Sequence, residues 1–151
     1  MTAVRVLLDR AVGYALAAVA DVPDGAASWP TPCAEWNLGE LLEHLDESVV
    51  VVSDVLGARR DRRTVAVGGC PVSADLVTAT AALELVVHGW DVRRAIGRGA
   101  AIPPDLATAL LAVAGLVVPV TNRRPQFADP VEPAPSAGPG DRLVAYLGRV
   151  P

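Results

Sequence analysis

Two side chains that commonly bind metal ions, Glu84 and His88, lie four residues apart in a stretch that predicts a helix. Residues at this spacing share one helix face about a turn apart, so both could reach one ion. The chain has only one other histidine, His44, on another predicted helix. Two His and one Glu form a known ligand set of catalytic zinc, which keeps one position open. We therefore expect His44, Glu84 and His88 to bind one divalent metal, and the ligand types favour zinc.

Asp91 follows His88 by one further turn and completes a polar row that begins at Thr80. We expect its carboxylate to accept the second ring N–H of His88 and so to orient the imidazole. A bound metal would polarise a carbonyl, or lower the pKa of a water or thiol until its anion forms near neutral pH. This chemistry makes Glu84, His88 and Asp91 the candidate catalytic residues.

The same residues have a simpler interpretation, because Glu-x-x-x-His is a weak motif by itself. Glu84, His88 and Asp91 could form an ordinary solvated stripe, with His44 making one hydrogen bond. The surroundings of the row favour the metal, because residues 74–96 predict one long helix that is apolar on nearly every side. Such a helix belongs at the centre of a bundle. A buried Glu without a partner would cost on the order of several kcal/mol, so inside the bundle it needs a cation or another partner.

The remaining apolar periodicity predicts three further long helices, over residues 4–20, 37–56 and 103–118. Asn37 and Glu40 form a capping box at the start of the second, and we expect Ser73 to cap the helix that carries Glu84. Residues 64–67 could form a short extended segment. The final residues, 141–151, predict a short helix that ends at Gly148. The fold class is therefore all-α, with four main helices in a single domain over residues 1–151.

The connections carry several residues that could be functional, although a structural role suits each of them better. We expect Trp29 and Trp36 to anchor the loop at residues 28–37, and Trp90 to be a core residue. Cys33 is expected to be a small packing residue and Cys70 a turn residue. The four arginines at positions 59, 60, 62 and 63 predict a solvated loop. Residues 123–140, rich in Pro and Gly, predict an ordered surface strap.

Composition excludes several classes of protein. The chain has 151 residues, of which 52% are hydrophobic and 20% charged, as in a globular domain. The net charge of −4 gives no basic surface for nucleic acid or an anionic membrane. No apolar run reaches the roughly 20 residues of a membrane span. Two cysteines do not make a disulfide framework, so we expect a cytoplasmic protein with reduced thiols.

Three segments of the chain resemble one protein family. Thr31-Pro-Cys-Ala-Glu-Trp-Asn-Leu-Gly-Glu-Leu-Leu-Glu-His-Leu45 resembles its "TPC-x-W … HL" segment, and Glu84-Leu-Val-Val-His-Gly-Trp-Asp91 its "E-x-x-x-HGWD" segment. Phe127-Ala-Asp-Pro-Val131, with the segment 141–151, resembles its ending. The family is that of the mycothiol-dependent maleylpyruvate isomerase-like metal-binding proteins, within the DinB/YfiT-like superfamily.

The resemblance implies a DinB/YfiT-like four-helix bundle that holds a divalent metal, usually zinc, through His44, Glu84 and His88. It also implies an activity like that of the superfamily's thiol-dependent isomerases and S-transferases, in which the metal activates the thiol mycothiol. Two segments of the family are missing, however. Only residues 58–73 join the first-histidine helix to the Glu84 helix, where relatives have a further helical segment, and the separate C-terminal domain of the isomerase is absent. We expect a wider metal cleft, or a homodimer that closes it.

Three functions follow from these residues. The first is a metal-dependent enzyme that carries out thiol transfer, isomerisation or cyclisation on a small carbonyl-bearing substrate. The second is a non-catalytic module for small-molecule binding or dimerisation that retains the bundle. The third is a metal-independent enzyme that uses Glu84 or Asp91 as acid/base with His88 as its partner. An open metal position inside a pocket of about 300–1,000 Å³ would favour an enzyme.

Overall fold

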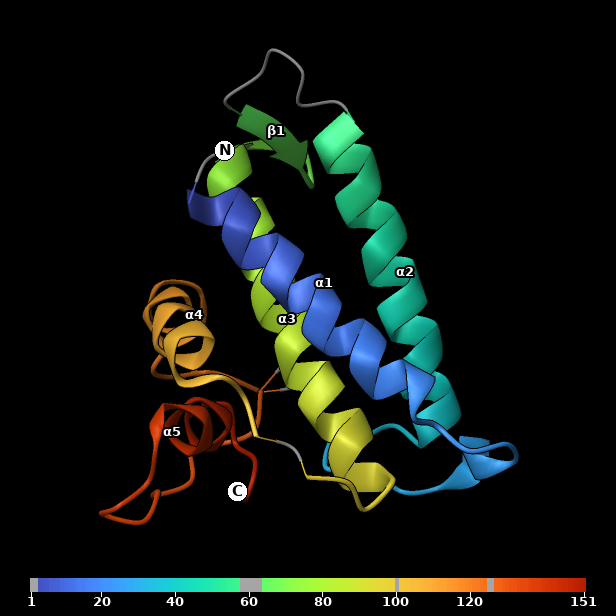
Figure 1. Ribbon diagram of the computed structural model, residues 1–151. Helices are drawn as coiled ribbons and strands as arrows, with labels where there is room; N and C mark the ends of the chain where they lie inside the picture. Colours follow the sequence, from blue (N-terminus) through green and yellow to red (C-terminus); the bar gives the residue numbers. More distant parts are fainter. Residues whose placement is uncertain (1–2, 58–63, 100, 125–126) are drawn as a thin grey trace.

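The computed structural model of the protein describes residues 3–57, 64–99, 101–124 and 127–151. Helix α3 (Ala74–Ala95) is its central element, and it packs against α1 (Ala3–Ala20), α2 (Leu38–Gly57) and α4 (Pro104–Val117). Its residues from Leu85 to Val92 are buried on all sides, as its sequence predicts, whereas Asp75 and Leu76 near its start are exposed. In Figure 1, α1 and α3 run side by side, whereas α2 diverges from them toward the end that carries the strands.

Helices α1 and α3 approach closely because the residues between them are small. Ala11, Ala15 and Ala18 of α1 are buried, as is Ala82 of α3. A Cβ atom added to Gly89 would lie 3.1 Å from Tyr14 and 3.2 Å from the Cα atom of Ala15. The close contact fixes α3 along its length, including the turn that carries the candidate ligands.

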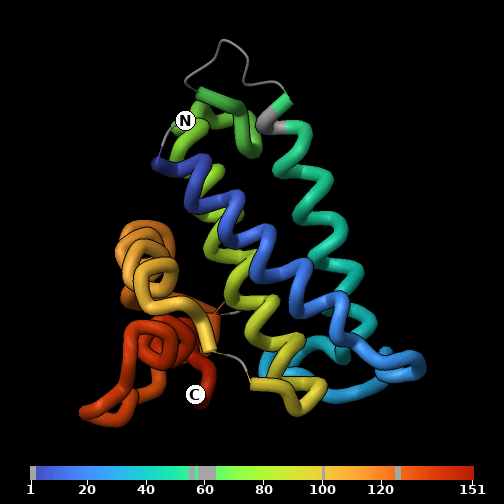
Figure 2. Tube along the Cα trace, viewed as in Figure 1, coloured from blue at the N-terminus to red at the C-terminus, as the bar shows by residue number. Residues whose placement is uncertain are grey.

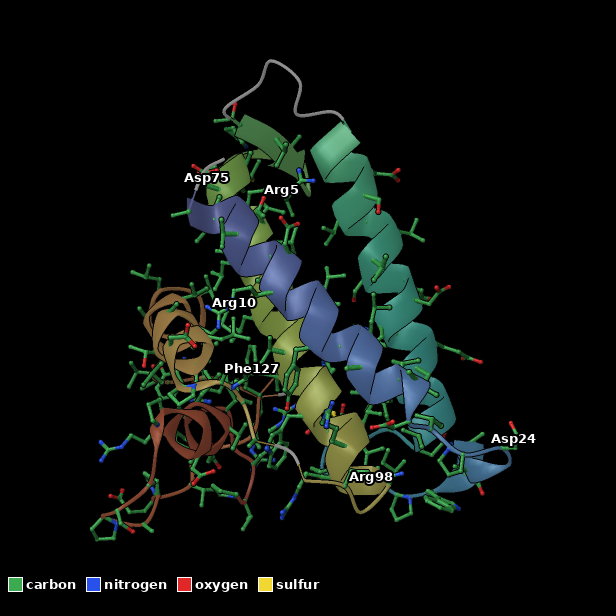
Figure 3. All side chains as sticks on the ribbon, in the orientation of Figure 1. Arg5, Arg10, Asp24, Asp75, Arg98 and Phe127 are labelled. Carbon is green, nitrogen blue, oxygen red and sulfur yellow. The ribbon has the colours of Figure 1, made fainter. Side chains whose placement is uncertain are left out.

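Helix α5 (Pro139–Tyr146) packs against α4, and the two lie together beside the α1–α3 pair in Figure 2. Arg10 of α1 reaches Asp105 of α4, with 2.8 Å between Nη2 and Oδ1, and Figure 3 labels Arg10 where it faces α4. Residues 127–138 form no regular element, as expected for a strap. The class is therefore mostly helical, with one small sheet.

That sheet is a hairpin of β1 (Thr64–Val67) and β2 (Cys70–Ser73), paired antiparallel with Thr64 opposite Ser73. The predicted extended segment at 64–67 is confirmed, but β2 was not predicted. The turn residues Gly68 and Gly69 have φ of +55° and +81°, as in the type I′ hairpin turn that Gly-Gly favours. The expectation that Cys70 is a turn residue is wrong, because it begins β2.

Of the two predicted side-chain caps, the one at α2 is present and the one at α3 is not. The capping box at α2 is confirmed, since Asn37 Oδ1 accepts from the Glu40 amide at 3.0 Å and Glu40 Oε2 from the Asn37 amide at 2.8 Å. Ser73 makes no side-chain cap bond at α3, because it is the last residue of β2. A short 3₁₀ helix, η1 (Ala26–Ser28), precedes the loop to α2.

Two further expectations concern tryptophans and the membrane. Trp90 is 4% exposed and belongs to the core, whereas Trp29 is 41% exposed and is not among the residues that pack against the core. No helix in the described ranges combines the length and the hydropathy needed to cross a membrane. The arginines at 59, 60, 62 and 63 lie outside the described residues.

Candidate metal centre

The structure brings together the three predicted ligands from two helices. His44 comes from α2, and Glu84 and His88 come from successive turns of α3. Glu84 Oε2 lies 3.4 Å from Nε2 of His44 and 3.4 Å from Nε2 of His88. One ligand atom from each side chain lies within 4.8 Å of the others. His44, which lies 40 positions before Glu84, therefore meets the Glu84–His88 pair at a single point.

The donor set and its spacing fit a zinc-like ion. Two tetrahedral zinc ligands with bonds of about 2.1 Å lie about 3.4 Å apart, which matches the separations from Glu84 to both histidines. Every separation within the group is at most 4.8 Å, so one ion could contact all three side chains. Imidazole and carboxylate are also the donors that zinc takes in catalytic sites.

Asp91 fixes the orientation and the tautomer of His88. The His88 Nδ1 atom lies 3.1 Å from Asp91 Oδ2, so Nδ1–H donates to this fully buried carboxylate. The Nε2 atom is then left to face Glu84 Oε2. If Nε2 carries no proton, its lone pair faces a carboxylate oxygen, and the two repel unless a cation lies between them. The pair thus requires either a proton or a metal ion at this point.

The pKa values of both groups reflect the same requirement. Burial alone would lower the pKa of His88, but its bonds and charge interactions with Asp91 and Glu84 outweigh burial and raise it. Burial alone would raise the pKa of Glu84, but His88 and His44 together outweigh it and lower that pKa. The cluster therefore binds positive charge, and a metal ion would displace the proton from His88.

Arg149, which the sequence analysis did not single out, neutralises Asp91. Its guanidinium forms a two-pronged pair with the carboxylate, at 3.1 Å from Nε to Oδ1 and 2.8 Å from Nη2 to Oδ2. A third bond joins Nη1 to the carbonyl of Leu147 at 3.1 Å. Asp91 is fully buried and the Arg149 side chain is 11% exposed, so the charge of each requires the other.

A glycine after α5 directs Arg149 into the site. Gly148 has φ of +84°, and the Arg149 amide donates to the carbonyl of Val144 at 2.9 Å, which closes the helix in a Schellman-like turn. A Cβ atom at position 148 would lie 2.6 Å from Cβ of Ala128. The predicted helix end at Gly148 is confirmed, and it also has a positional role.

The loop before α2 supplies an aromatic wall. The Trp36 ring lies 4.5 Å from the His44 ring and 5.7 Å from the His88 ring, measured between centroids. Thr31 holds this loop closed, because its hydroxyl donates to the carbonyls of Cys33 and Trp36 at 2.9 and 2.8 Å. Trp36 therefore packs as predicted, but against the imidazoles.

Cys33 is half-buried beside the same charges but is not in the ligand group. Burial raises the pKa of its thiol, and the nearby positive charge of Arg149 only partly offsets this. A protonated thiol is a poor nucleophile, which agrees with the packing role expected from the sequence. Cys70 is exposed on β2, and both cysteines are free.

A pocket of about 530 Å³ opens beside the three ligands, between α2, α3 and the hairpin. His44 and Glu84 lie in its wall, with Thr80 of the predicted polar row. Its other walls are mainly apolar side chains from α2, β1, β2 and α3, namely Val51, Val52, Val67, Val72, Leu76 and Val77. An ion held by His44 and Glu84 would therefore be within reach of a molecule in this pocket.

Sequence reasoning missed Arg149 because nothing in its spacing relates it to Asp91, which lies 58 positions earlier. A signal was present in Asp91 itself, since a carboxylate in the middle of an apolar helix demands a cationic partner. The chain offers 13 arginines and no lysine, however, so only the tertiary structure can select the partner.

Two uncharacterised proteins of Mycobacterium tuberculosis, from strains CDC 1551 / Oshkosh and H37Rv, are similar to this chain. Each is 27% identical to it over 172 aligned residues, which cover 93% of this chain and 94% of the relative. No family model matches the chain, and no solved structure gives a significant match. Because the alignment is longer than the 151 residues of this chain, the relatives carry inserted residues that this chain lacks.

Proposed function

We propose that this protein is a divalent-metal-dependent enzyme, with zinc bound by His44, Glu84 and His88. Its reaction would be thiol transfer, isomerisation or cyclisation on a small carbonyl-bearing substrate. The observation that carries the proposal is the convergence of the three ligand atoms at the wall of an open pocket. A resident metal with an accessible position suits catalysis better than a closed structural site.

The proposal includes membership of the DinB/maleylpyruvate isomerase-like superfamily and its four-helix bundle, here formed by α1 to α4. The motifs around Trp36, His44 and Glu84 to Asp91 support it, because their side chains meet in one site. Mycothiol would be the co-substrate by the same resemblance. A cytoplasmic location completes the proposal, and it agrees with two free thiols.

The chain's own residues have separate tasks in this mechanism. When bound, the metal would polarise a carbonyl or stabilise a thiolate. Asp91 holds the Nδ1 proton of His88, so Nε2 is presented as a ligand. Arg149 neutralises Asp91, and Trp36 shields the imidazoles from water on one side. Glu84 lies between both histidines, and its carboxylate would supply the negative charge of the ligand set.

Metal analysis of protein purified without chelator tests the proposal. We expect close to one zinc, or a similar divalent ion, per chain, and less than about a tenth of that in His88→Ala or His44→Ala, because two remaining ligands hold zinc poorly. Glu43→Gln is the matched control, since it removes an exposed carboxylate next to His44 without touching the group. A metal content near zero in the wild type, or one unchanged in His88→Ala, would contradict the proposal.

A further inference from the structure

We infer that the pocket beside the candidate ligands binds the apolar body of a small uncharged molecule, whose single polar head reaches the metal. The inferred position of the polar head depends on the proposed metal site, whereas the inferred binding of the apolar body depends on the pocket alone. The inference narrows the class of the carbonyl-bearing substrate from any small compound to one with an aliphatic or aromatic body.

The lining of the pocket carries the argument. Valine and leucine side chains from α2, α3 and both strands face it, and its polar groups gather at the end with His44 and Glu84. Its volume of about 530 Å³ is in the range of pockets that enclose small ligands. A mostly apolar wall with a few polar groups at one end fixes both the chemistry and the direction of a ligand.

Within the part of the chain that the structure describes, several of these apolar side chains are left partly exposed. Val51 is 60% exposed, Val67 is 51% exposed and Leu76 is 38% exposed, although they come from three different elements and face one space. Exposed apolar surface of this kind marks a ligand groove or an interface. Continuity with His44 and Glu84 favours a ligand that also reaches the metal.

Charge selects against anionic bodies. Glu47 lines the pocket from α2, one turn beyond His44, and Glu84 lies at its inner end. A carboxylate or phosphate on the body of a ligand would lose its hydration against valine side chains and face the carboxylate of Glu47, which is not a candidate metal ligand. The pocket is therefore complementary to a neutral apolar body and disfavours dianionic substrates such as short dicarboxylates.

Alkanethiols on the cobalt-substituted protein test both parts separately. Cobalt uptake, seen in its visible spectrum, reports the metal site, and the thiolate-to-cobalt charge-transfer band reports thiol binding. From ethanethiol to hexanethiol we expect affinity to rise about fourfold for each added CH₂, the value of burying one methylene. The anionic analogue 6-mercaptohexanoate should bind at least about tenfold more weakly than hexanethiol.

Two variants locate the effect. Val51→Ser and Leu76→Ser should each weaken hexanethiol binding by about fivefold or more, and leave ethanethiol binding unchanged, because only the longer chain reaches them. Leu116→Ser is the matched control, since Leu116 is 79% exposed on α4 and does not line the pocket. Affinity that does not depend on chain length, in a protein that binds cobalt, overturns the inference and leaves the metal proposal standing.

A metal-free measurement covers the opposite case. In chelated protein, 1-hexanol should shift the methyl NMR signals of Val51, Val72 and Leu76 but not those of Leu116. This result supports the apolar pocket even if no metal binds and the proposed function fails. If those methyl signals instead shift with protein concentration, and Val51→Asp abolishes a dimer, a second copy of the chain occupies the pocket and the inference is wrong.

Discussion

Loss of the Arg149 guanidinium should destabilise the protein far more than loss of any surface arginine. In Arg149→Met the fully buried Asp91 carboxylate loses both prongs of its pair. Breaking a buried ion pair from one side costs about 3–5 kcal/mol, because the remaining charge stays out of water. Methionine approximates the length of the side chain, so the loss reports charge rather than packing.

Urea unfolding of chelated protein measures the effect without a contribution from metal binding. With a slope of about 2 kcal/mol/M, the expected loss lowers the unfolding midpoint by about 1.5–2.5 M. Arg124→Met is the control, because the Arg124–Asp129 pair joins side chains that are 72% and 75% exposed. Such a pair contributes less than about 1 kcal/mol, so its midpoint should fall by less than about 0.5 M.

A double-mutant cycle identifies the cause. Asp91→Asn with Arg149→Met removes both charges, so the double variant should be at least about 1 kcal/mol more stable than the sum of the single effects predicts. Arg149→Met should also weaken zinc binding by about 10–100-fold, because His88 loses its oriented partner. Strict additivity, or an Arg149→Met protein as stable as Arg124→Met, would refute the account of Asp91 as a buried charge.

Three further outcomes follow from the same structure. The chelated protein should lose stability above about pH 6.5, because the raised pKa of His88 stabilises the fold only while His88 is protonated. It should also lose stability below about pH 4.5, because the lowered pKa of Glu84 stabilises the fold only while Glu84 is ionised. Urea midpoints measured across pH check both losses, and a zinc-loaded sample should instead gain stability as pH rises. Gly148→Ala should lower the melting temperature more than Gly97→Ala, since both have positive φ but only position 148 adds a clash, and equal effects would contradict this. Asn37→Ala should cost about 1 kcal/mol in urea unfolding and Ser73→Ala almost nothing, because only Asn37 caps its helix; a larger loss for Ser73→Ala would be inconsistent with the structure.

Much of the fold could be predicted because its signals are local. Helix periodicity placed α1 to α4 within a residue or two of their ends, and Asn37 with Glu40 marked the start of α2 through bonds only three residues apart. The hairpin turn is equally local, since Gly68 and Gly69 join two short segments, but the sequence analysis predicts Cys70 as a turn residue and Ser73 as a helix cap and so misses β2. The prediction that Ser73 caps α3 left no room for a strand that ends at Ser73.

The sequence by itself determined the row of Glu84, His88 and Asp91, because a helix repeats every 3.6 residues and needs no tertiary contact to align them. Only the tertiary structure decided that His44 faces this row across two packed helices, that Arg149 is the cation for Asp91, and that a pocket opens at Glu84. Those facts depend on how far apart helices pack and where a chain turns, as at Gly89 and Gly148. Helix spacing and chain direction result from many weak contacts, and no single residue pattern encodes them.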